Sequence, residues 1–178
     1  MNARLVLTVI GVDRPGLVDR LSAVIAQSQG SWQKSRMARL AGQFAGIVEV
    51  DVPSDAVSSI TSALRALDGL AVQVHAADPE AFGHIKDPAQ PAPRTARLAF
   101  VGQDRPGLVQ AISRVLAQAG VNVDELDTRT FVAPMSGVPI FEAEAAVHLP
   151  TTLTLDSLRA ALEAVARDLV VDVDLTEL

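Results

Sequence analysis

The pattern of apolar and polar residues in the first half of the chain is repeated in the second half. Near the N-terminus, the β-branched run ARLVLTVIG predicts a buried strand. Apolar residues then recur at helical spacing from Leu17, and Gly30 ends that predicted helix. SWQKSRMARL and QFAGIVEVDV predict two strands joined at Ala41-Gly42, the second with valines alternating with acids. A helix capped by Ser54 and the strand LAVQV complete the order βαββαβ.

The second half of the chain predicts the same order. A strand over 97–102 precedes a helix from Leu108, residues 141–149 alternate like a half-buried strand, and LVVDVDL closes the copy. The strand after Gly120 does not alternate cleanly, which indicates a bulge in it, and the hairpin APMSGVP is longer than its counterpart. We therefore predict an α+β protein of two tandem ferredoxin-like units with antiparallel sheets, packed side by side.

The repeat is strict enough to indicate duplication. Positions 10–27 and 101–118 are identical at 11 of 18 places at a constant offset of 91. We expect domains over 1–76 and 96–178, joined by a linker over 77–95 whose prolines cannot continue a helix or a central strand. A unit of roughly 75 to 80 residues is only marginally stable alone, so each should pack against the other or against a second chain.

Composition limits the class of protein. Apolar residues make up 49% of the chain, which is typical of a folded protein. The absence of Cys excludes disulfides, thiolate metal sites and a Cys nucleophile. No apolar run approaches the roughly 20 residues of a membrane span, and the N-terminus opens directly into a strand pattern, so we expect a cytoplasmic protein.

The net charge of −6 is unevenly distributed. Residues 1–76 carry 7 Lys and Arg against 6 Asp and Glu, whereas residues 96–178 carry 6 against 12. A protein that binds nucleic acid without sequence preference needs a basic face to neutralise phosphates. The second half has the opposite balance, so direct binding to nucleic acid is not expected.

The repeated loop Asp-Arg-Pro-Gly is the main candidate for a ligand site. Proline presets the dihedral of the first helical turn, and the Asp13 carboxylate can accept from the Gly16 amide. Glycine leaves room for a ligand to approach the free amides that start the helix, which favour an anionic group such as a carboxylate. Turn mechanics alone accounts for Pro and Gly but not for the Arg, which could bind a carboxylate ligand or an acidic residue of a partner. Duplication alone would also retain that Arg.

Two segments give the chain a family resemblance. The repeated DRPGLV after an apolar strand and SWQKSRMARLAGQFAGI over 31–47 resemble the tandem ACT-domain proteins, and most closely the group of glycine cleavage system transcriptional repressors. The resemblance covers nearly the whole chain apart from the linker. It implies a regulatory, non-catalytic protein whose units pair side by side into a continuous sheet. Amino acids would bind where the first loop meets a neighbouring unit.

The resemblance also suggests ligand-binding residues. ACT domains that bind amino acids often place an Asn just after the first helix, where this chain has Asn122 in the second copy but Ser31 in the first. The second loop is therefore the stronger candidate. The predicted ligand-binding residues are Asp104, Arg105, Pro106, Gly107, Leu108 and Asn122 in the second copy, and Asp13, Arg14, Pro15, Gly16 and Leu17 in the first.

Other residues with reactive side chains offer no competing site. The three histidines, His75, His84 and His148, are isolated, so neither a metal site nor a catalytic histidine is expected. Glu142 and Glu144 could suggest an acid–base pair, but alternate acids on a wet sheet face are more often solvated. Ser22 and Ser113 lack a His partner, and the single Trp32 more often packs at an edge or interface. No cofactor, metal or catalytic residue is predicted.

Three hypotheses remain open. The first is an amino-acid-sensing regulator of glycine cleavage or amino-acid metabolism that acts through a protein partner, as a homodimer or larger assembly. The second is an ACT interaction module without a ligand, and the third is a remnant of a folate-deformylase-type enzyme. If the ligand is glycine, its five heavy atoms limit binding to about 7.5 kcal/mol, a dissociation constant of order micromolar at best. We therefore expect a sensor working at roughly tens of micromolar to millimolar.

Overall fold

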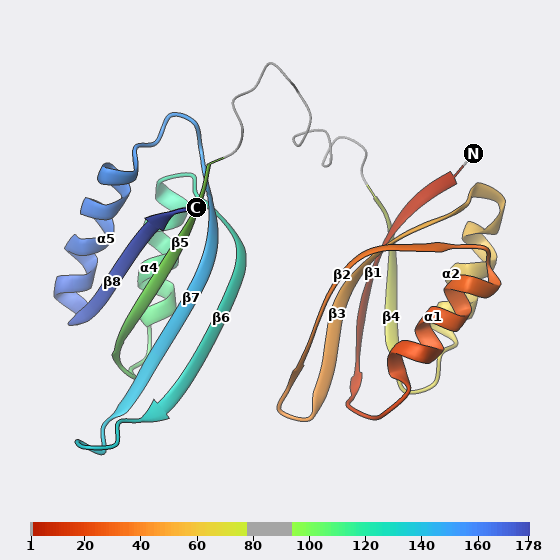
Figure 1. Cartoon of the computed structure of the whole chain (residues 1–178), viewed down its shortest axis with the longest axis horizontal. Helices are drawn as coiled ribbons and strands as arrows, with labels where there is room; N and C mark the ends of the chain where they lie inside the picture. The colour runs from red at the N-terminus through yellow and green to blue at the C-terminus, as the bar shows by residue number, and fades with distance from the viewer. Residues whose placement is uncertain (1, 78–93) are drawn as a thin grey trace. The chain divides into compact units, whose positions relative to one another are not determined.

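The computed structural model describes residues 2–77 and 94–178, which divide into two units. Figure 1 shows each unit with its own sheet and its own pair of helices. Most of the predicted linker, including His84, lies outside the described residues. Packing of the two units against each other stays a prediction.

The first unit has the predicted βαββαβ order, with one short turn added. Its elements are β1 (Asn2–Val12), α1 (Leu17–Gln27), β2 (Ser31–Leu40), β3 (Gln43–Pro53), η1 (Ser54–Ala56), α2 (Val57–Arg65) and β4 (Ala71–Ala76). The prediction that Ser54 caps the second helix is wrong. Ser54 instead opens a 3-10 turn, so that α2 starts only at Val57 with Ala56 as its N-cap.

The second unit repeats this order. Its elements are β5 (Arg94–Gln103), α4 (Leu108–Gln118), β6 (Asn122–Val132), β7 (Pro139–Leu149), α5 (Leu155–Leu169) and β8 (Val171–Glu177). Strand β5 begins at Arg94, two residues before the predicted domain start, because Arg94 and Thr95 already pair with Leu149 and His148 of β7.

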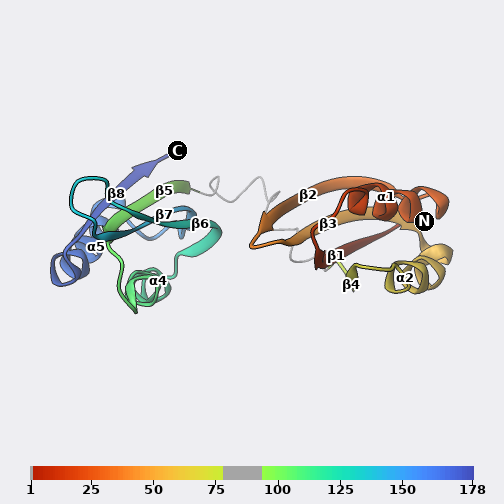
Figure 2. The same cartoon turned by 90° about the horizontal axis from the view of Figure 1, so that it is seen from below.

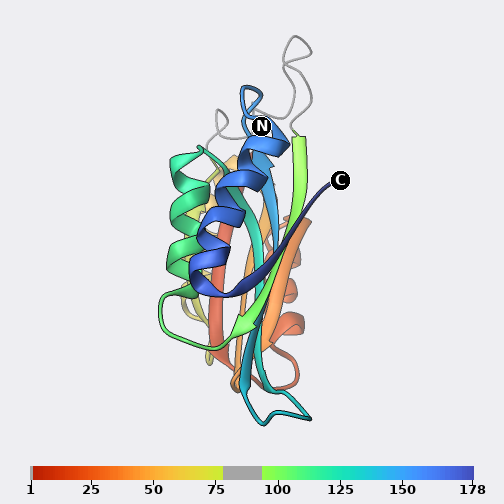
Figure 3. The same cartoon turned by 90° about the vertical axis from the view of Figure 1, so that its left-hand side faces the viewer.

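Both sheets are antiparallel, with strand orders β2-β3-β1-β4 and β6-β7-β5-β8. In each unit both helices cover the same face of the sheet (Figures 2 and 3). The predicted alternation explains that layering. Val48, Val50 and Val52 of β3 face the helices and are 0% exposed, as are Leu21 of α1 and Leu64 of α2. Complete burial of an aliphatic side chain contributes about 1.5–3 kcal/mol, so this one face holds each unit together. The α+β prediction of two ferredoxin-like units is confirmed.

The outermost strands β2 and β6 each contain a bulge. In β6 the register with β7 shifts between Val123 and Glu125, which confirms the predicted bulge. In β2 the register with β3 shifts between Trp32 and Lys34, a bulge at the equivalent position that the sequence pattern did not reveal. Strand β6 is exposed along its whole length, so it has no apolar face to alternate.

The two hairpins differ as predicted. Leu40 pairs with Gln43, and the intervening Ala41 and Gly42 both have positive φ, the geometry of a tight two-residue hairpin turn. The longer turn after β6 is closed by the Ala133 amide, which donates to the Val138 carbonyl at 2.9 Å. Among the described residues, no helix is long and apolar enough to cross a membrane.

Candidate ligand site at the repeated loops

The loop Asp13–Gly16 lies at one end of the first sheet, between two other chain segments. At this end Val12 of β1 pairs with Gln43 of β3, and Ile10 of β1 pairs with Ala71 of β4. The β2–β3 hairpin and the connection from α2 to β4 therefore flank the loop on opposite sides. The second unit has the same arrangement, since Gln103 pairs with Ile140 and Gly102 with Val171.

Both loops end at a glycine that starts a helix. Gly16 has φ +89° and Gly107 has φ +94°, and neither α1 nor α4 has a side-chain N-cap. Helix α5 differs, because the Thr154 hydroxyl accepts from the Ser157 amide at 3.2 Å. The first amides of α1 and α4 thus lack an acceptor within the helix. A Cβ on Gly16 or Gly107 would meet no heavy atom within 4 Å, so both loops are open to an approaching group.

Asp13 is held from the hairpin side. Its amide donates to the Gly42 carbonyl at 2.9 Å, and its carboxylate accepts from Arg39 Nη1 at 3.3 Å. The expected acceptance from the Gly16 amide is therefore replaced by an ion pair with β2. In the second unit the Asp104 amide makes the equivalent backbone hydrogen bond, donating to the Pro139 carbonyl at 2.8 Å.

Arg14 is held from the opposite side, by the turn between α2 and β4. Its Nη2 donates to the Asp68 carbonyl at 3.1 Å and to the Asp68 carboxylate at 3.0 Å. Arg20 of α1 also donates to that carbonyl, from Nη1 at 3.0 Å. Two guanidinium groups thus converge on one residue of the turn that follows α2.

Arg105 makes the equivalent backbone contact in the second unit. Its Nη2 donates to the carbonyl of Leu169, the last residue of α5. In both units the motif arginine therefore ties the loop to the junction between the second helix and the last strand. This gives the repeated Arg a structural role, which the sequence argument from turn mechanics did not include.

The charges around the two loops differ. Thr130 replaces Arg39 at the offset of 91, and Leu169 replaces Asp68 at an offset of 101. Asp68 and Leu169 each stand directly before a residue with positive φ. Within residues 2–77 and 94–178, neither Asp104 nor Arg105 has an ion-pair partner. Both residues are exposed.

The other predicted residues are distributed unevenly. Leu17 and Leu108 are each 2% exposed, so only their backbone amides can reach a ligand at the surface. Asn122 begins β6, where it pairs with His148, and its side-chain amide donates to Asp124 at 2.7 Å. This is the opposite end of the sheet from Asp104, about 25 Å away along the strands. The second unit alone does not bring Asn122 to its loop.

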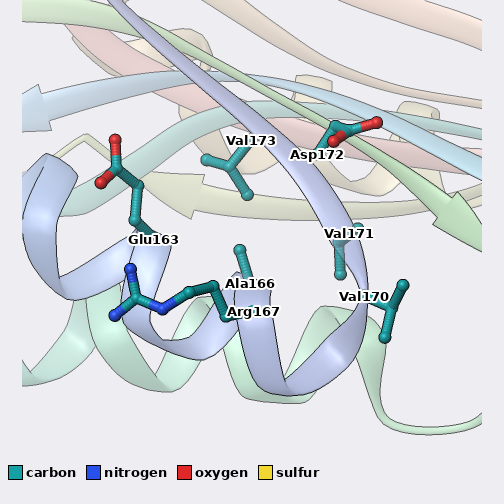
Figure 4. A pocket seen from close by; sticks show the side chains of 7 residues that line it. All are labelled: Glu163, Ala166, Arg167, Val170, Val171, Asp172 and Val173. Atoms are coloured by element: carbon teal, nitrogen blue, oxygen red, sulfur yellow. The ribbon is translucent and has the colours of Figure 1, made fainter.

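A groove adjoins the backbone that Arg105 contacts. It has a volume of about 520 Å³ and is lined by Glu163, Ala166 and Arg167 of α5, by Val170, and by Val171, Asp172 and Val173 of β8 (Figure 4). Val170 directly follows Leu169, so the groove and the contact share the junction of α5 with β8.

The face of the second sheet away from the helices is acidic. A hollow there is lined by Asp127, Thr128, Arg129, Glu142 and Glu144. Arg129 bonds to Glu142, and Arg97 Nη2 donates to Glu144 at 2.5 Å. The hydrogen bond from Arg97 and its positive charge lower the pKa of Glu144 below the ordinary value. These two acids are thus ion-paired with arginines rather than merely solvated as the sequence suggested.

The histidines of the described residues do not assemble a metal site. His148 Nδ1 lies 3.6 Å from the Asp124 carboxylate, and no group of three or more His, Asp or Glu within residues 2–77 and 94–178 could hold a metal ion.

Comparison with known proteins identifies the first unit. The ACT domain model matches residues 3–76, which span the first unit. The second unit has the same strand order and repeats the same loop 91 residues later. The first unit is therefore an ACT domain, and the chain as a whole resembles the tandem ACT-domain proteins. Its resemblance to the glycine cleavage system transcriptional repressors is also confirmed, since it is 24% identical to the protein of that name from Escherichia coli K12 over 169 residues, which cover 93% of this chain and 85% of that protein.

Solved structures agree with this assignment of the fold. The crystal structure of an unknown protein from Galdieria sulphuraria is 33% identical, with a TM-score of 0.87 over 100% of this chain and 99% of its own. A candidate glycine cleavage system transcriptional repressor superposes with a TM-score of 0.72 at 19% identity, covering 100% of this chain and 98% of its own.

Three important residues near the loops escaped the sequence reasoning. Asp68, Leu169 and Arg39 lie 26 to 64 residues from the side chains that they contact. Asp68-Gly69 could be recognised only as a helix end. The useful signal would have been a comparison of the two copies at that position, where an acid in one is replaced by a leucine in the other.

Proposed function

We propose that this protein is a non-catalytic sensor of a small amino acid such as glycine, with its working site at the loop of the second unit. The ligand carboxylate would bind the first amides of α4 and the guanidinium of Arg105. Pro106 and Gly107 shape the loop, and Leu108 contributes its amide. The regulated process would be glycine cleavage or a related branch of amino-acid metabolism in the cytoplasm.

The observation that carries this proposal is the unpaired charge of the second loop. Arg105 has no carboxylate partner among the described residues, and the N-terminus of α4 has no side-chain cap. A guanidinium close to free helix amides favours a carboxylate, since both supply donors to the same anion. The first loop has the same backbone, but its Arg14 is already paired with Asp68.

Asn122 would complete the site from a second copy of the chain. It lies at the far end of its own sheet from Asp104, so one unit cannot use both residues. Antiparallel pairing of β6 with β6 of a second copy would bring Asn122 of one copy beside the second loop of the other. The ligand would then bridge two units, and binding would change how they pair.

The charges of the edge strands favour an alternative pairing, of β2 with β6, which would bring Asn122 to the first loop of the neighbouring copy instead. Strand β2 contains Lys34, Arg36 and Arg39 and no acid. Strand β6 contains Asp124, Glu125 and Asp127 with a single Arg129. Glu125 and Asp127 stand where β2 has Lys34 and Arg36, so pairing β2 of one copy with β6 of another joins opposite charges. A homodimer or larger assembly is therefore part of the proposal.

Regulation would run through a protein partner. The related Escherichia coli protein is named a transcriptional repressor. Residues 96–178 carry twice as many acids as bases, a balance that disfavours contact with phosphates. Binding of an amino acid would alter a surface offered to the partner.

The decisive experiment is a thermal-shift screen of the twenty amino acids at about ten millimolar, a concentration that suits a small, weakly bound ligand. Arg105→Ala is the test variant, and Arg14→Ala is its matched control, since each removes a contact with the end of a helix. One amino acid that stabilises the wild type and Arg14→Ala, but not Arg105→Ala, is the expected result.

Other results would favour the alternatives. A flat screen on folded protein would support an ACT interaction module without a ligand. Turnover of an amino acid or folate substrate by the isolated chain would support the enzyme remnant. A ligand that binds without changing subunit association or partner affinity would leave the site but contradict the switch.

A further inference from the structure

The two loops differ in one contact that decides whether the motif arginine can take a ligand carboxylate. In the first unit the Asp68 carboxylate lies 3.0 Å from Arg14 Nη2. In the second unit Leu169 provides only its backbone carbonyl to Arg105. The glycine N-caps and the helix starts are alike in the two units, although Asp13 is paired with Arg39 and Asp104 has no such partner among the described residues.

We propose that Asp68 is an internal substitute for the ligand carboxylate, which weakens binding at the first loop and leaves each chain with the second loop as its stronger site. This inference rests on the proposed function, since it assumes that a carboxylate binds at Arg105. It adds the residue that makes the two sites unequal and identifies the first unit as the copy that binds a ligand carboxylate more weakly.

Three details of the first unit support the substitution. Arg14 uses the same Nη2 for the Asp68 carbonyl and the Asp68 carboxylate, so one residue holds it by backbone and side chain. Arg20 adds a second guanidinium, 3.0 Å from the carbonyl and 4.0 Å from the carboxylate. At the offset of 91, Arg20 is replaced by Ala111, so the second unit lacks both the acid and the extra base.

The residue after Asp68 also differs from its counterpart in the second unit. Gly69 has no side chain, and a Cβ there would lie 1.8 Å from Arg14 Nη2. Its counterpart is Val170, a residue with positive φ and an 80% exposed side chain. Arg14 therefore packs closely against a bare backbone beside Asp68, whereas the presence of a valine prevents Arg105 from packing in the same way.

The exposure of the Asp68 side chain limits how strongly it can weaken ligand binding at Arg14. The Asp68 side chain is 88% exposed, and an exposed ion pair shifts an equilibrium by a factor of at most about five. A ligand carboxylate entering the first loop would also meet the like charge of Asp68. Together these effects should weaken carboxylate binding at Arg14 by about tenfold relative to Arg105.

The test follows each arginine separately in the full chain. The Nε–Hε NMR signals of Arg14 and Arg105, assigned with Arg14→Lys and Arg105→Lys, are titrated with glycine and, for the carboxylate alone, with acetate. Asp68→Asn removes the internal carboxylate, and Asp68→Ser does so with a different side chain. Leu169→Asp introduces a carboxylate into the second unit, and Asp55→Asn removes an exposed acid from the first unit as the control.

In the wild type and Asp55→Asn, we expect glycine to shift the Arg105 signal at concentrations that leave Arg14 unchanged. Asp68→Asn and Asp68→Ser should make Arg14 respond with about tenfold higher affinity than in the wild type. Leu169→Asp should weaken the response of Arg105 by a similar factor. Calorimetry should find one stronger glycine site per wild-type chain and two comparable sites per Asp68→Asn chain.

Two results overturn the inference in distinguishable ways. If Arg105 responds but Arg14 stays silent without Asp68, the substitution is wrong and the proposed function stands. If neither arginine responds to glycine, acetate or any of the other amino acids in any variant, the proposed function fails and the inference with it. Equal responses of Arg14 and Arg105 in the wild type would also contradict weaker binding at the first loop.

Discussion

A side chain on Gly69 would collide with the guanidinium of Arg14, because its Cβ would lie 1.8 Å from Arg14 Nη2. Gly69 also has φ +77°, a conformation that costs other residues about 1 kcal/mol. Gly69→Ala should therefore lower the free energy of unfolding by about 2 kcal/mol, through backbone strain and the loss of contacts to Arg14. Urea denaturation measures the change.

Gly42→Ala is the matched control for this substitution. Gly42 has nearly the same φ, +76°, but its Cβ would meet nothing within 4 Å. Gly42→Ala should therefore lower the free energy of unfolding by the backbone strain alone, about 1 kcal/mol. Equal losses at the two positions would show that contact with Arg14 contributes nothing to stability.

Val170 occupies the corresponding position of the second unit at an energetic cost. It has φ +52° after α5, where a β-branched residue is strained and glycine is preferred. Val170→Gly should raise the free energy of unfolding by about 1 kcal/mol, since the side chain is 80% exposed and little packing is lost. Ala161→Gly in the middle of α5 should lower it by about 1 kcal/mol, and a loss at both positions would contradict the strain at Val170.

The secondary structure and the architecture were readable from local patterns. Alternation in β3 and helical spacing from Leu17 reflect which face of each element is buried, and burial is what the hydrophobic pattern records. Strand β2 shows the limit of that reasoning. Its bulge at Gln33 lies on a largely exposed edge, where neither face imposes a pattern.

The candidate site was predictable only in part, for a physical reason. The Asp-Arg-Pro-Gly loop can be recognised as a turn from its own residues, because Pro and Gly favour particular backbone conformations there. The contacts of Arg14 and Arg105 depend instead on how the end of the second helix packs beside the loop. The helix end is recognisable from Gly69, but nothing in the sequence indicates that an arginine 54 residues earlier binds there.

The helix-facing and solvent-facing sides of β3 should respond differently to truncation. Val50 is 0% exposed, whereas Ile47 is 56% exposed on the opposite face. Val50→Ala should lower the free energy of unfolding by about 2 kcal/mol, since it removes buried methyl groups and leaves a cavity. Ile47→Ala should cost less than about 1 kcal/mol. Thermal denaturation measures both, and similar losses would contradict the register of β3.

Acid should destabilise the protein through three ion-paired carboxylates. Hydrogen bonds from Arg4, Arg97 and Arg94 lower the pKa values of Asp51, Glu144 and Glu177, respectively, below their ordinary values of 3.8 for Asp and 4.5 for Glu. A carboxyl whose pKa is lower in the folded state stabilises the fold above its unfolded pKa. That contribution is lost as the pH falls through the folded pKa.

The free energy of unfolding should therefore decrease below about pH 4.5. Glu177→Gln removes one of these groups, since Glu177 accepts from Arg94 Nε at 2.7 Å. Its unfolding midpoint should fall less between pH 5 and pH 3 than that of the wild type, as followed by circular dichroism. An unchanged acid dependence would show that this ion pair contributes nothing to stability.

Charge reversal on the edge strands tests the proposed pairing of copies. Lys34 of β2 and Asp127 of β6 are both exposed. An antiparallel alignment centred on Ser35 and Leu126 would place Lys34 opposite Asp127. Lys34→Glu should then weaken self-association by several-fold, because it sets like charges against each other. Adding Asp127→Lys to the same chain should restore association, since the exchanged charges attract again.

The readout is molar mass by light scattering over a dilution series at low and high salt. Pairing that depends on exposed charges should weaken as salt rises, since the screening length is about 8 Å at physiological ionic strength. Arg65→Glu, a reversal in α2 outside both edge strands, is the control and should leave association unchanged. If Lys34→Glu assembles like the wild type, or the double variant fails to recover, the copies do not pair through β2 and β6.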